Sequence, residues 1–188
     1  HHLCGEAVLM PVSVRIHLQV LSVAAAIVLA IPGAATGQNA QQAPCSAPEY
    51  RHFDFWVGDW EVRNAAGNLA GTNSITPMLN GCVLHEQWSG SSGSVGESFN
   101  IYDQSTGTWH QTWVDNGGLL LRLDGGLEGD SMVLRGELQG RDGAMRQHRI
   151  TWTPRDDGSV RQHWENSTDG ESWNTLFDGT YRPRDASD

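Results

Sequence analysis

Hydrophobic and polar residues alternate in a series of short segments that begins at residue 60 and continues to residue 181. A period of two is typical of β-strands with one buried face, and Gly, Asp and Asn between the segments indicate tight turns. The chain beyond residue 56 shows no sustained helical periodicity. The pattern predicts ten strands. The first begins at residue 60, and the other nine cover residues 69–78, 82–88, 96–102, 108–115, 119–123, 132–138, 145–153, 159–166 and 172–181.

The turn signals decide how these strands connect. Asn80-Gly81 is a strong hairpin signal, Gly107 closes a tight turn, and residues 124–126 (Asp-Gly-Gly) are interpreted as a further turn. Short turns produce an antiparallel meander, and closing the meander removes its exposed edges. We therefore predict an all-β fold, an antiparallel up-and-down β-barrel of about 8–10 strands. A two-sheet sandwich is the alternative.

The densest apolar stretch comes just before the first predicted strand. Phe53, Phe55, Trp56 and Trp60 lie within eight residues of one another. Burial of such side chains stabilises a fold by roughly 1.5–3 kcal/mol each. We interpret the stretch as a plug at one end of the barrel that leads into the first strand.

The N-terminal region resembles a secretory signal peptide at residues 1–37, with residues 1–9 upstream of a start at Met10. An apolar run at 18–31, too short to span a bilayer, follows one basic residue and is followed by small residues. An uncleaved membrane anchor is the alternative. The rest of the chain is divided into a linker at 38–50, a β-barrel domain at 51–183 and a tail at 184–188.

The chain carries 22 acidic and 12 basic residues, a net charge of −10. Loss of residues 1–37 removes one acid and one base, so the net charge stays the same. An acidic surface repels phosphate backbones, which excludes nucleic acid as a main partner. Every basic residue is Arg, which excludes a Schiff base on lysine.

Two cysteines, Cys45 and Cys82, remain after removal of the signal peptide. In an oxidising compartment such a pair predicts a disulfide. It would close a loop of nearly forty residues and contribute about 3–4 kcal/mol; two separate thiols are the alternative. With the signal peptide, the pair predicts a periplasmic or extracellular protein.

Gly58-Asp59-Trp60 resembles the Gly-x-Trp signature of lipocalins and the wider calycin superfamily. In those barrels the Trp closes one end and an Arg near the last strand stacks on it. The resemblance implies structural roles for Trp56, Gly58 and Trp60, and it implies that Arg182 stacks on Trp60.

The wider pattern is similar to a bacterial secreted family of uncharacterised lipocalin-like proteins. The resemblance implies fold and location, and no reaction. The glycine-rich continuation of haem-binding nitrobindin-like barrels is missing, so we expect no haem and no other cofactor. The matching segments lie at residues 53–60 (FDFWVGDW), 81–86, 102–107, 109–115 and 178–181.

The hairpin formed by the predicted strands at 96–102 and 108–115 offers a candidate ligand surface. A four-residue turn at 104–107 places Asn100 opposite Gln111. The face that carries these two residues combines aromatic side chains with hydrogen-bonding groups, as ligand pockets do. A solvated outer face is the alternative. The candidate ligand-binding residues are Glu86, Trp88, Asn100, Tyr102, Trp109, Gln111, Trp113, Arg149, Gln162 and Trp164.

Glu86 and Asp115 are the candidate catalytic carboxylates. A Glu between Leu84 and Trp88 in a barrel interior would be desolvated, which favours its protonated form unless Arg149 pairs with it. A structural ion pair is the alternative for Glu86, and a turn cap is the alternative for Asp115. The histidines and cysteines have no metal-ligand spacing, so we expect no metal site.

These observations favour a secreted protein that binds a small apolar or aromatic molecule in the barrel lumen. One alternative is an isomerase, cyclase or hydrolase that uses a pocket carboxylate. Another is a carbohydrate-binding module, which would present a row of exposed Trp side chains. The expected partner is a small molecule, with no nucleic acid and no stable membrane insertion after processing.

Overall fold

The computed structural model describes residues 43–184, which belong to one compact unit, Gln41–Asp188. The predicted signal peptide lies outside the described residues, as do the start of the linker and residues 185–188. Short 3-10 helices are η1 (Pro48–Arg51), η2 (Asp54–Trp56) and η3 (Leu79–Gly81). The strands are β1 (Gly58–Asn64), β2 (Leu69–Met78), β3 (Val83–Gly90), β4 (Val95–Asp103), β5 (Thr108–Asp115), β6 (Leu120–Glu128), β7 (Ser131–Gln139), β8 (Met145–Pro154), β9 (Val160–Ser167) and β10 (Asn174–Pro183).

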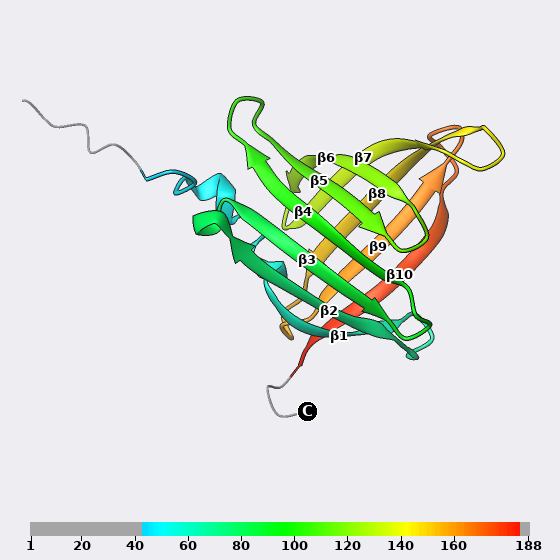
Figure 1. The fold of residues 1–188 in the computed structure, drawn as a ribbon, viewed down its shortest axis with the longest axis horizontal. Coiled ribbons are helices and arrows are strands. Elements are labelled where there is room, and N and C mark those ends of the chain that lie inside the picture. Colours follow the sequence, from blue (N-terminus) through cyan, green and yellow to red (C-terminus); the bar gives the residue numbers. More distant parts are fainter. Residues whose placement is uncertain (1–42, 185–188) are drawn as a thin grey trace, which may run out of the picture. The chain divides into compact units, whose positions relative to one another are not determined.

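The ten strands of the described chain form one closed antiparallel barrel (Figure 1). Each strand pairs with the next along the chain, and β10 returns to pair with β1, where Val62 lies opposite Tyr181. This confirms the predicted up-and-down barrel and excludes the two-sheet sandwich. Closure leaves no free edge that another chain could extend.

The register of the β4–β5 hairpin agrees with the prediction. Asn100 pairs with Gln111 and Tyr102 pairs with Trp109, on either side of the turn at 104–107. Because side chains alternate between faces along a strand, this register places every second residue of the hairpin in the barrel interior.

The predicted turn at residues 124–126 is wrong, because β6 continues through it to Glu128. Gly125 lies opposite Leu134 of β7. A Cβ atom at this position would overlap the carbonyl oxygen of Val133, so only glycine allows the two strands to approach so closely. Both glycines lie within the paired strands β6 and β7, and Gly125 marks a point of close approach, not a turn.

Aromatic residues from the start of the chain close one end of the barrel. The Phe53 and Trp56 rings are fully buried and stack with centroids 4.8 Å apart. Phe53 also meets Trp152 of β8 at 5.1 Å and Trp109 of β5 at 5.8 Å. We call these residues, with Trp60, the aromatic plug. Their burial explains why the apolar stretch before β1 is so dense.

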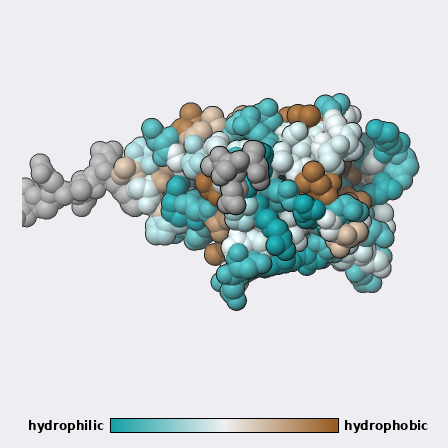
Figure 2. Space-filling view, turned by 90° about the horizontal axis from the view of Figure 1, so that it is seen from below, coloured by the Kyte–Doolittle hydropathy of each residue, from teal (hydrophilic) through white to brown (hydrophobic). Residues whose placement is uncertain are grey.

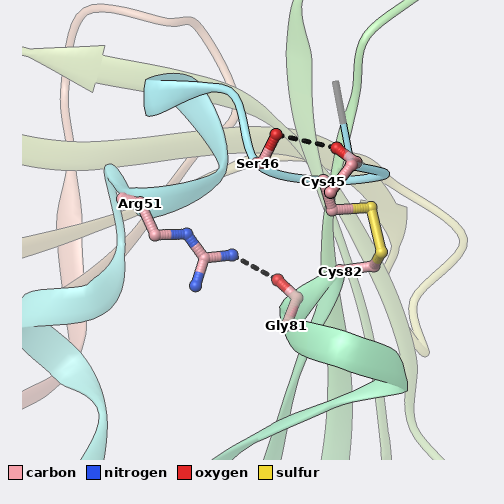
Figure 3. Close-up of a disulfide and its surroundings, with 6 residues drawn as sticks. Cys45, Ser46, Arg51, Gly81 and Cys82 are labelled. Atoms are coloured by element: carbon pink, nitrogen blue, oxygen red, sulfur yellow. Dashed lines mark hydrogen bonds between the residues drawn. A yellow bond between two sulfur atoms is a disulfide. The ribbon is translucent and has the colours of Figure 1, made fainter. Parts of the chain in front are cut away.

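A disulfide joins Cys45 to Cys82, as predicted, and attaches the arm before η1 to the start of β3 (Figure 3). Arg51 donates a hydrogen bond to the carbonyl oxygen of Gly81 and supports the same junction. The two cross-links hold the arm that carries the plug. A disulfide of this kind favours an oxidising, extracytoplasmic compartment.

The outer surface seen in Figure 2 is mostly hydrophilic, with small separate apolar areas. Exposed hydrophobic residues on the outer face of the β3–β6 wall include Phe99, Ile101 and Val114. Among residues 43–184, no helix is long and apolar enough to cross a membrane.

Candidate functional site

A cavity of about 290 Å³ lies inside the barrel, beyond the aromatic plug. Its wall combines aromatic side chains with a few polar groups, which is typical of small-molecule sites. Exposed serines of the β3–β4 loop stand at its outer end, so the cavity opens to solvent there. The lining residues are Ala70, Glu86, Trp88, Ser92, Ser94, Gln111, Trp113, Leu121, Ile150, Gln162, Trp164, Phe177 and Tyr181.

Three strands that run in the same direction give the cavity two layers. On β3, Glu86 is followed two residues later by Trp88, and β5 repeats the pattern with Gln111 and Trp113. The third pair, on β9, is again glutamine–x–tryptophan and ends at Trp164. Residues two apart share a strand face, so the carboxyl and amide groups lie deeper in the barrel and the indoles lie closer to its mouth.

Glu86 is held by a chain of buried polar side chains. Its Oε1 accepts a hydrogen bond from Asn73 Nδ2 at 2.7 Å, and its Oε2 accepts one from Ser98 Oγ at 2.6 Å. Asn100 Nδ2 donates to Ser98 Oγ at 2.9 Å, and Gln111 Nε2 donates to Asn100 Oδ1 at 2.8 Å. The chain fixes the carboxyl group and links it to Gln111 on the cavity wall.

Tyr181 extends the chain across the barrel to the opposite wall. Its hydroxyl accepts a hydrogen bond from Asn73 Nδ2 at 3.3 Å and donates one to Gln162 Oε1. Burial, together with the nearby Glu86 carboxylate, raises the pKa of Tyr181 well above 10. The phenol therefore remains a hydrogen-bond donor over the physiological pH range.

Burial raises the pKa of Glu86 from its ordinary value of 4.5 to about 7, against the lowering effect of the Ser98 and Asn73 hydrogen bonds and of His85. The side chain is 4% exposed, so water stabilises its charged form poorly. Near neutral pH, Glu86 is therefore able to exist in both protonation states. That property suits either ligand recognition or proton transfer.

His148 on β8 orients the outer layer of the cavity. Its Nδ1 accepts a hydrogen bond from Trp164 Nε1 at 3.0 Å. Burial, with a smaller effect of the Arg146 charge, lowers the pKa of His148. The neutral imidazole is the form that offers Nδ1 as an acceptor, so the indole of Trp164 is held in place at physiological pH.

Six of the sequence-predicted ligand residues meet at this cavity: Glu86, Trp88, Gln111, Trp113, Gln162 and Trp164. Asn100 lies behind the wall and holds Gln111. Trp109 belongs to the aromatic plug, and Tyr102 packs beside it with ring centroids 6.2 Å apart. These two residues lie outside the cavity lining, although they share the inner face of the hairpin.

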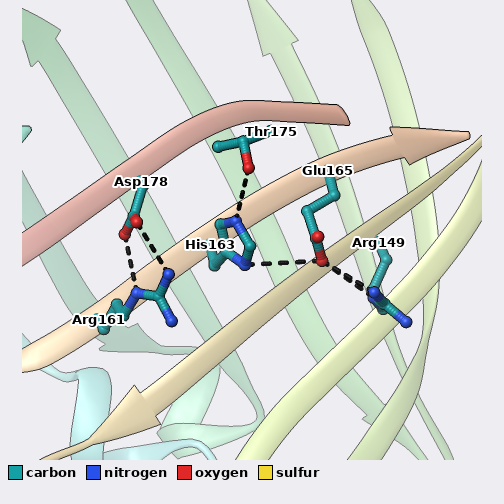
Figure 4. Close-up of polar contacts among 6 residues, drawn as sticks. All are labelled: Arg149, Arg161, His163, Glu165, Thr175 and Asp178. Atoms are coloured by element: carbon teal, nitrogen blue, oxygen red, sulfur yellow. Dashed lines mark hydrogen bonds and ion pairs between the residues drawn. The ribbon is translucent and has the colours of Figure 1, made fainter. Parts of the chain in front are cut away.

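The expectation that Arg149 lies in the lumen is wrong. Arg149 occupies the outer face of β8, next to the inward-facing His148 and Ile150. Its guanidinium binds Glu165 at 3.0 Å (Figure 4). It also stacks on Trp173 at 4.2 Å. A buried cation would lose its hydration, whereas on the outer face Arg149 keeps a partner and water. Glu86 is left without the predicted arginine.

Asp115, the other catalytic candidate, lies at the end of β5. Its Oδ1 accepts hydrogen bonds from the backbone N–H groups of Gly117 at 2.8 Å and Leu119 at 3.0 Å. The side chain therefore caps the β5–β6 turn and is committed to the backbone. The catalytic interpretation of Asp115 loses its support.

The Gly-x-Trp segment places Trp60 in the core without the predicted arginine stack. Trp60 Nε1 donates to the carbonyl oxygen of Trp56 at 2.9 Å. Gly58 has a φ of 145° and lies under the Trp60 ring, where a side chain would strain the backbone. Arg182 is exposed and lies opposite Glu61, because its neighbour Tyr181 takes the inward position.

Several residues of the site were not predicted. Asn73 lies on β2 midway between Gly71 and Ile75, and all three residues are buried. This alternation with a period of two is the sequence signal that indicates the inward position of Asn73. Tyr181 and Phe177 come from β10, where no local pattern separates lining residues from core residues. Their place in the site depends on closure of the barrel.

Comparison of the chain with protein-family models and with curated proteins gives no match. The site is therefore characterised by its own geometry. Within residues 43–184, no group of three or more His, Cys, Asp or Glu side chains is arranged to hold a metal ion.

Proposed function

We propose that this protein is a secreted, lipocalin-like binding protein whose barrel lumen holds a small, largely aromatic or apolar molecule. The observation that carries the proposal is the open cavity of about 290 Å³ with indole side chains near its mouth and hydrogen-bonding groups at its base. The volume is at the lower end of ligand pockets, which are about 300–1,000 Å³, and therefore suits a molecule of one or two rings.

The eight tryptophans of the chain support this function over a carbohydrate-binding module. Four belong to the aromatic plug and three line the cavity. The eighth, Trp173, packs under Arg149 on the outer face. A surface that stacks on sugars needs a row of exposed aromatic rings, and the described residues do not present one.

The proposal is tested by titrating the ¹⁵N-labelled protein with indole and following the indole N–H resonances of its tryptophans. Binding in the lumen shifts the resonances of Trp88, Trp113 and Trp164. The Trp173 resonance serves as an internal control on the outer face and stays in place. Shifts at Trp173 alone, or no shift at millimolar indole, would contradict the proposal.

A second candidate function is acid–base catalysis by Glu86, for example in an isomerase, cyclase or hydrolase. One observation favours it: the carboxyl group lines the cavity, lacks an arginine partner, and has a pKa near the working pH of a general acid or base. This candidate uses the same cavity, and it predicts that Glu86→Gln abolishes turnover while a bound product analogue retains its affinity.

A further inference from the structure

The cavity has an unbalanced charge. Glu86 is the one carboxylic acid among the described residues that line it, and none of these residues is basic. Arg149 and Arg161, which are next in sequence to the lining residues Ile150 and Gln162, lie on the outer face and are bound to Glu165 and Asp178 (Figure 4). An anionic ligand would therefore meet a carboxylate and no compensating cation.

The titratable groups around Glu86 do not supply the missing charge. His85 lies on the outer face of β3 and binds Glu97 at 2.7 Å, and its charge has the smallest of the effects that lower the pKa of Glu86. Tyr181, which faces Glu86 from β10, remains neutral, and the groups that contact Glu86 from β2 and β4 are uncharged. His148 on β8 is buried and accepts the Trp164 hydrogen bond.

The Glu86 carboxyl group has acceptor capacity that the protein does not use. Each Glu86 oxygen accepts one hydrogen bond from the protein, whereas a carboxylate is able to accept about four in total. Asn73 Oδ1, behind the residues that line the cavity, is also buried without a hydrogen-bond partner among the described residues. A ligand with N–H donors would use the free acceptor capacity of Glu86.

The wall above the carboxyl group is aromatic. Trp88, Trp113, Trp164 and Phe177 line the outer layer, and the rings of Trp88 and Phe177 meet at 6.2 Å. Aromatic faces attract cations, and the attraction is stronger in desolvated sites. The wall therefore favours a positively charged group as well as an apolar body.

We propose that the ligand of this lumen is an organic ammonium ion: an amine that donates hydrogen bonds to Glu86 and lays an aromatic or apolar body among Trp88, Trp113 and Trp164. This inference rests on the proposed binding function and names its ligand class. The ammonium group supplies the positive charge that balances the Glu86 carboxylate in the lumen. Neutral alcohols of the same shape bind more weakly, and carboxylates are rejected.

The test is a charge series of similar shape, measured by isothermal titration calorimetry at pH 8. The probes are 2-phenylethylamine, 2-phenylethanol and 3-phenylpropionate. A charge-assisted hydrogen bond to a buried carboxylate predicts that the amine binds about tenfold or more tightly than the alcohol. The carboxylate is expected to give no measurable heat.

The matched variants are Glu86→Gln in the lumen and Glu97→Gln on the outer face. Glu86→Gln should lower the affinity for the amine to that of the alcohol, because it removes the charge and keeps the shape. Its affinity for the alcohol should stay within a factor of about three. Glu97→Gln makes the same chemical change at an exposed position and should alter neither affinity.

Binding of the amine should also depend on pH. Because the cation needs ionised Glu86, apparent affinity should fall roughly tenfold per unit as the pH drops from 7 to 5. The alcohol should show no such slope. The slope should disappear in Glu86→Gln and persist in His148→Gln and His85→Gln, which assigns it to the carboxyl group.

The outcomes separate this inference from the proposed function. Equal binding of the amine and the alcohol, unaffected by Glu86→Gln, would overturn the ammonium inference and leave a lumen that binds neutral aromatics. Tightest binding of the carboxylate would overturn it as well. Failure of all three probes and of indole to shift the Trp88, Trp113 and Trp164 resonances would reject the binding function itself.

Discussion

Glu86 is the residue at which stability and function oppose one another. Transfer of a carboxylate into a buried site is costly unless a cation compensates it. Two hydrogen bonds offset only part of that cost, because burial still raises the pKa of Glu86 to about 7. A fold selected for stability alone would place an uncharged side chain here, so the carboxyl group indicates a functional site.

Replacement of Glu86 by Gln should stabilise the protein at pH 8. Between its ordinary pKa of 4.5 and about 7, the folded state holds a proton that the unfolded state has lost, so stability decreases as the pH rises through this window. Each unit corresponds to about 1.36 kcal/mol, so removal of the charge should add about 1–3 kcal/mol at pH 8. Urea unfolding of both proteins measures the difference.

The same comparison at pH 5 provides the control. Glu86 is largely protonated in the folded state there, so the variant and the parent should differ by less than about 1 kcal/mol. A Glu86→Gln variant that is less stable than the parent at pH 8 would show that the carboxylate is compensated in the folded protein.

At the scale of the element, the close pairing of β6 with β7 depends on one glycine. Addition of a Cβ at Gly125 would overlap backbone atoms of Val133 and Leu134, and neither can move without disturbing the sheet. Gly126, the next residue, has open space around the corresponding position. Two adjacent glycines of the same strand therefore have different reasons to be there.

Gly125→Ala should destabilise the barrel by about 1–3 kcal/mol, as overpacked positions do, whereas Gly126→Ala should change stability by less than about 0.5 kcal/mol. Urea unfolding of the two variants side by side measures the contrast. Equal effects would mean that the strands separate easily at this point and that the close approach is not a structural requirement.

The arm that carries η1 and η2 depends on its covalent link to β3. The Cys45–Cys82 disulfide closes a segment with a sequence separation of 37. Replacement of both cysteines by Ser should therefore cost about 3–4 kcal/mol of unfolding free energy. The parent protein unfolded under reducing conditions should lose the same amount. A smaller loss in both experiments would show that the aromatic plug alone holds the arm.

At the scale of the whole molecule, local patterns predict some parts of the site and not others. The β4–β5 face was predictable because a short turn fixes the register and hence places Gln111 inside. The expectation for Arg149 is wrong because only the second half of β8 alternates clearly: Ile150 and Trp152 mark the inner face there, and Arg149 has the opposite parity. Tyr181 meets Asn73 across 108 positions of sequence, which only barrel closure determines.

Because some tryptophans belong to the aromatic plug and others line the lumen, their replacement should affect stability and ligand affinity differently. Trp60 is 5% exposed and hydrogen-bonded within the plug, so Trp60→Ala should lower stability by about 3–5 kcal/mol, as large-to-small core changes do. Trp113 is only partly buried and lines the cavity. Trp113→Ala should therefore cost less stability than Trp60→Ala and weaken indole binding more strongly.

Thermal unfolding and calorimetric titration of the two variants separate these roles. Trp60→Ala, measured at a temperature where it is folded, should retain indole affinity within a factor of about three, because no residue of the aromatic plug lines the cavity. An unchanged melting temperature for Trp60→Ala would contradict the structural role of the plug. Loss of stability in Trp113→Ala without loss of affinity would place Trp113 in the core and would show that indole does not bind against this part of the wall.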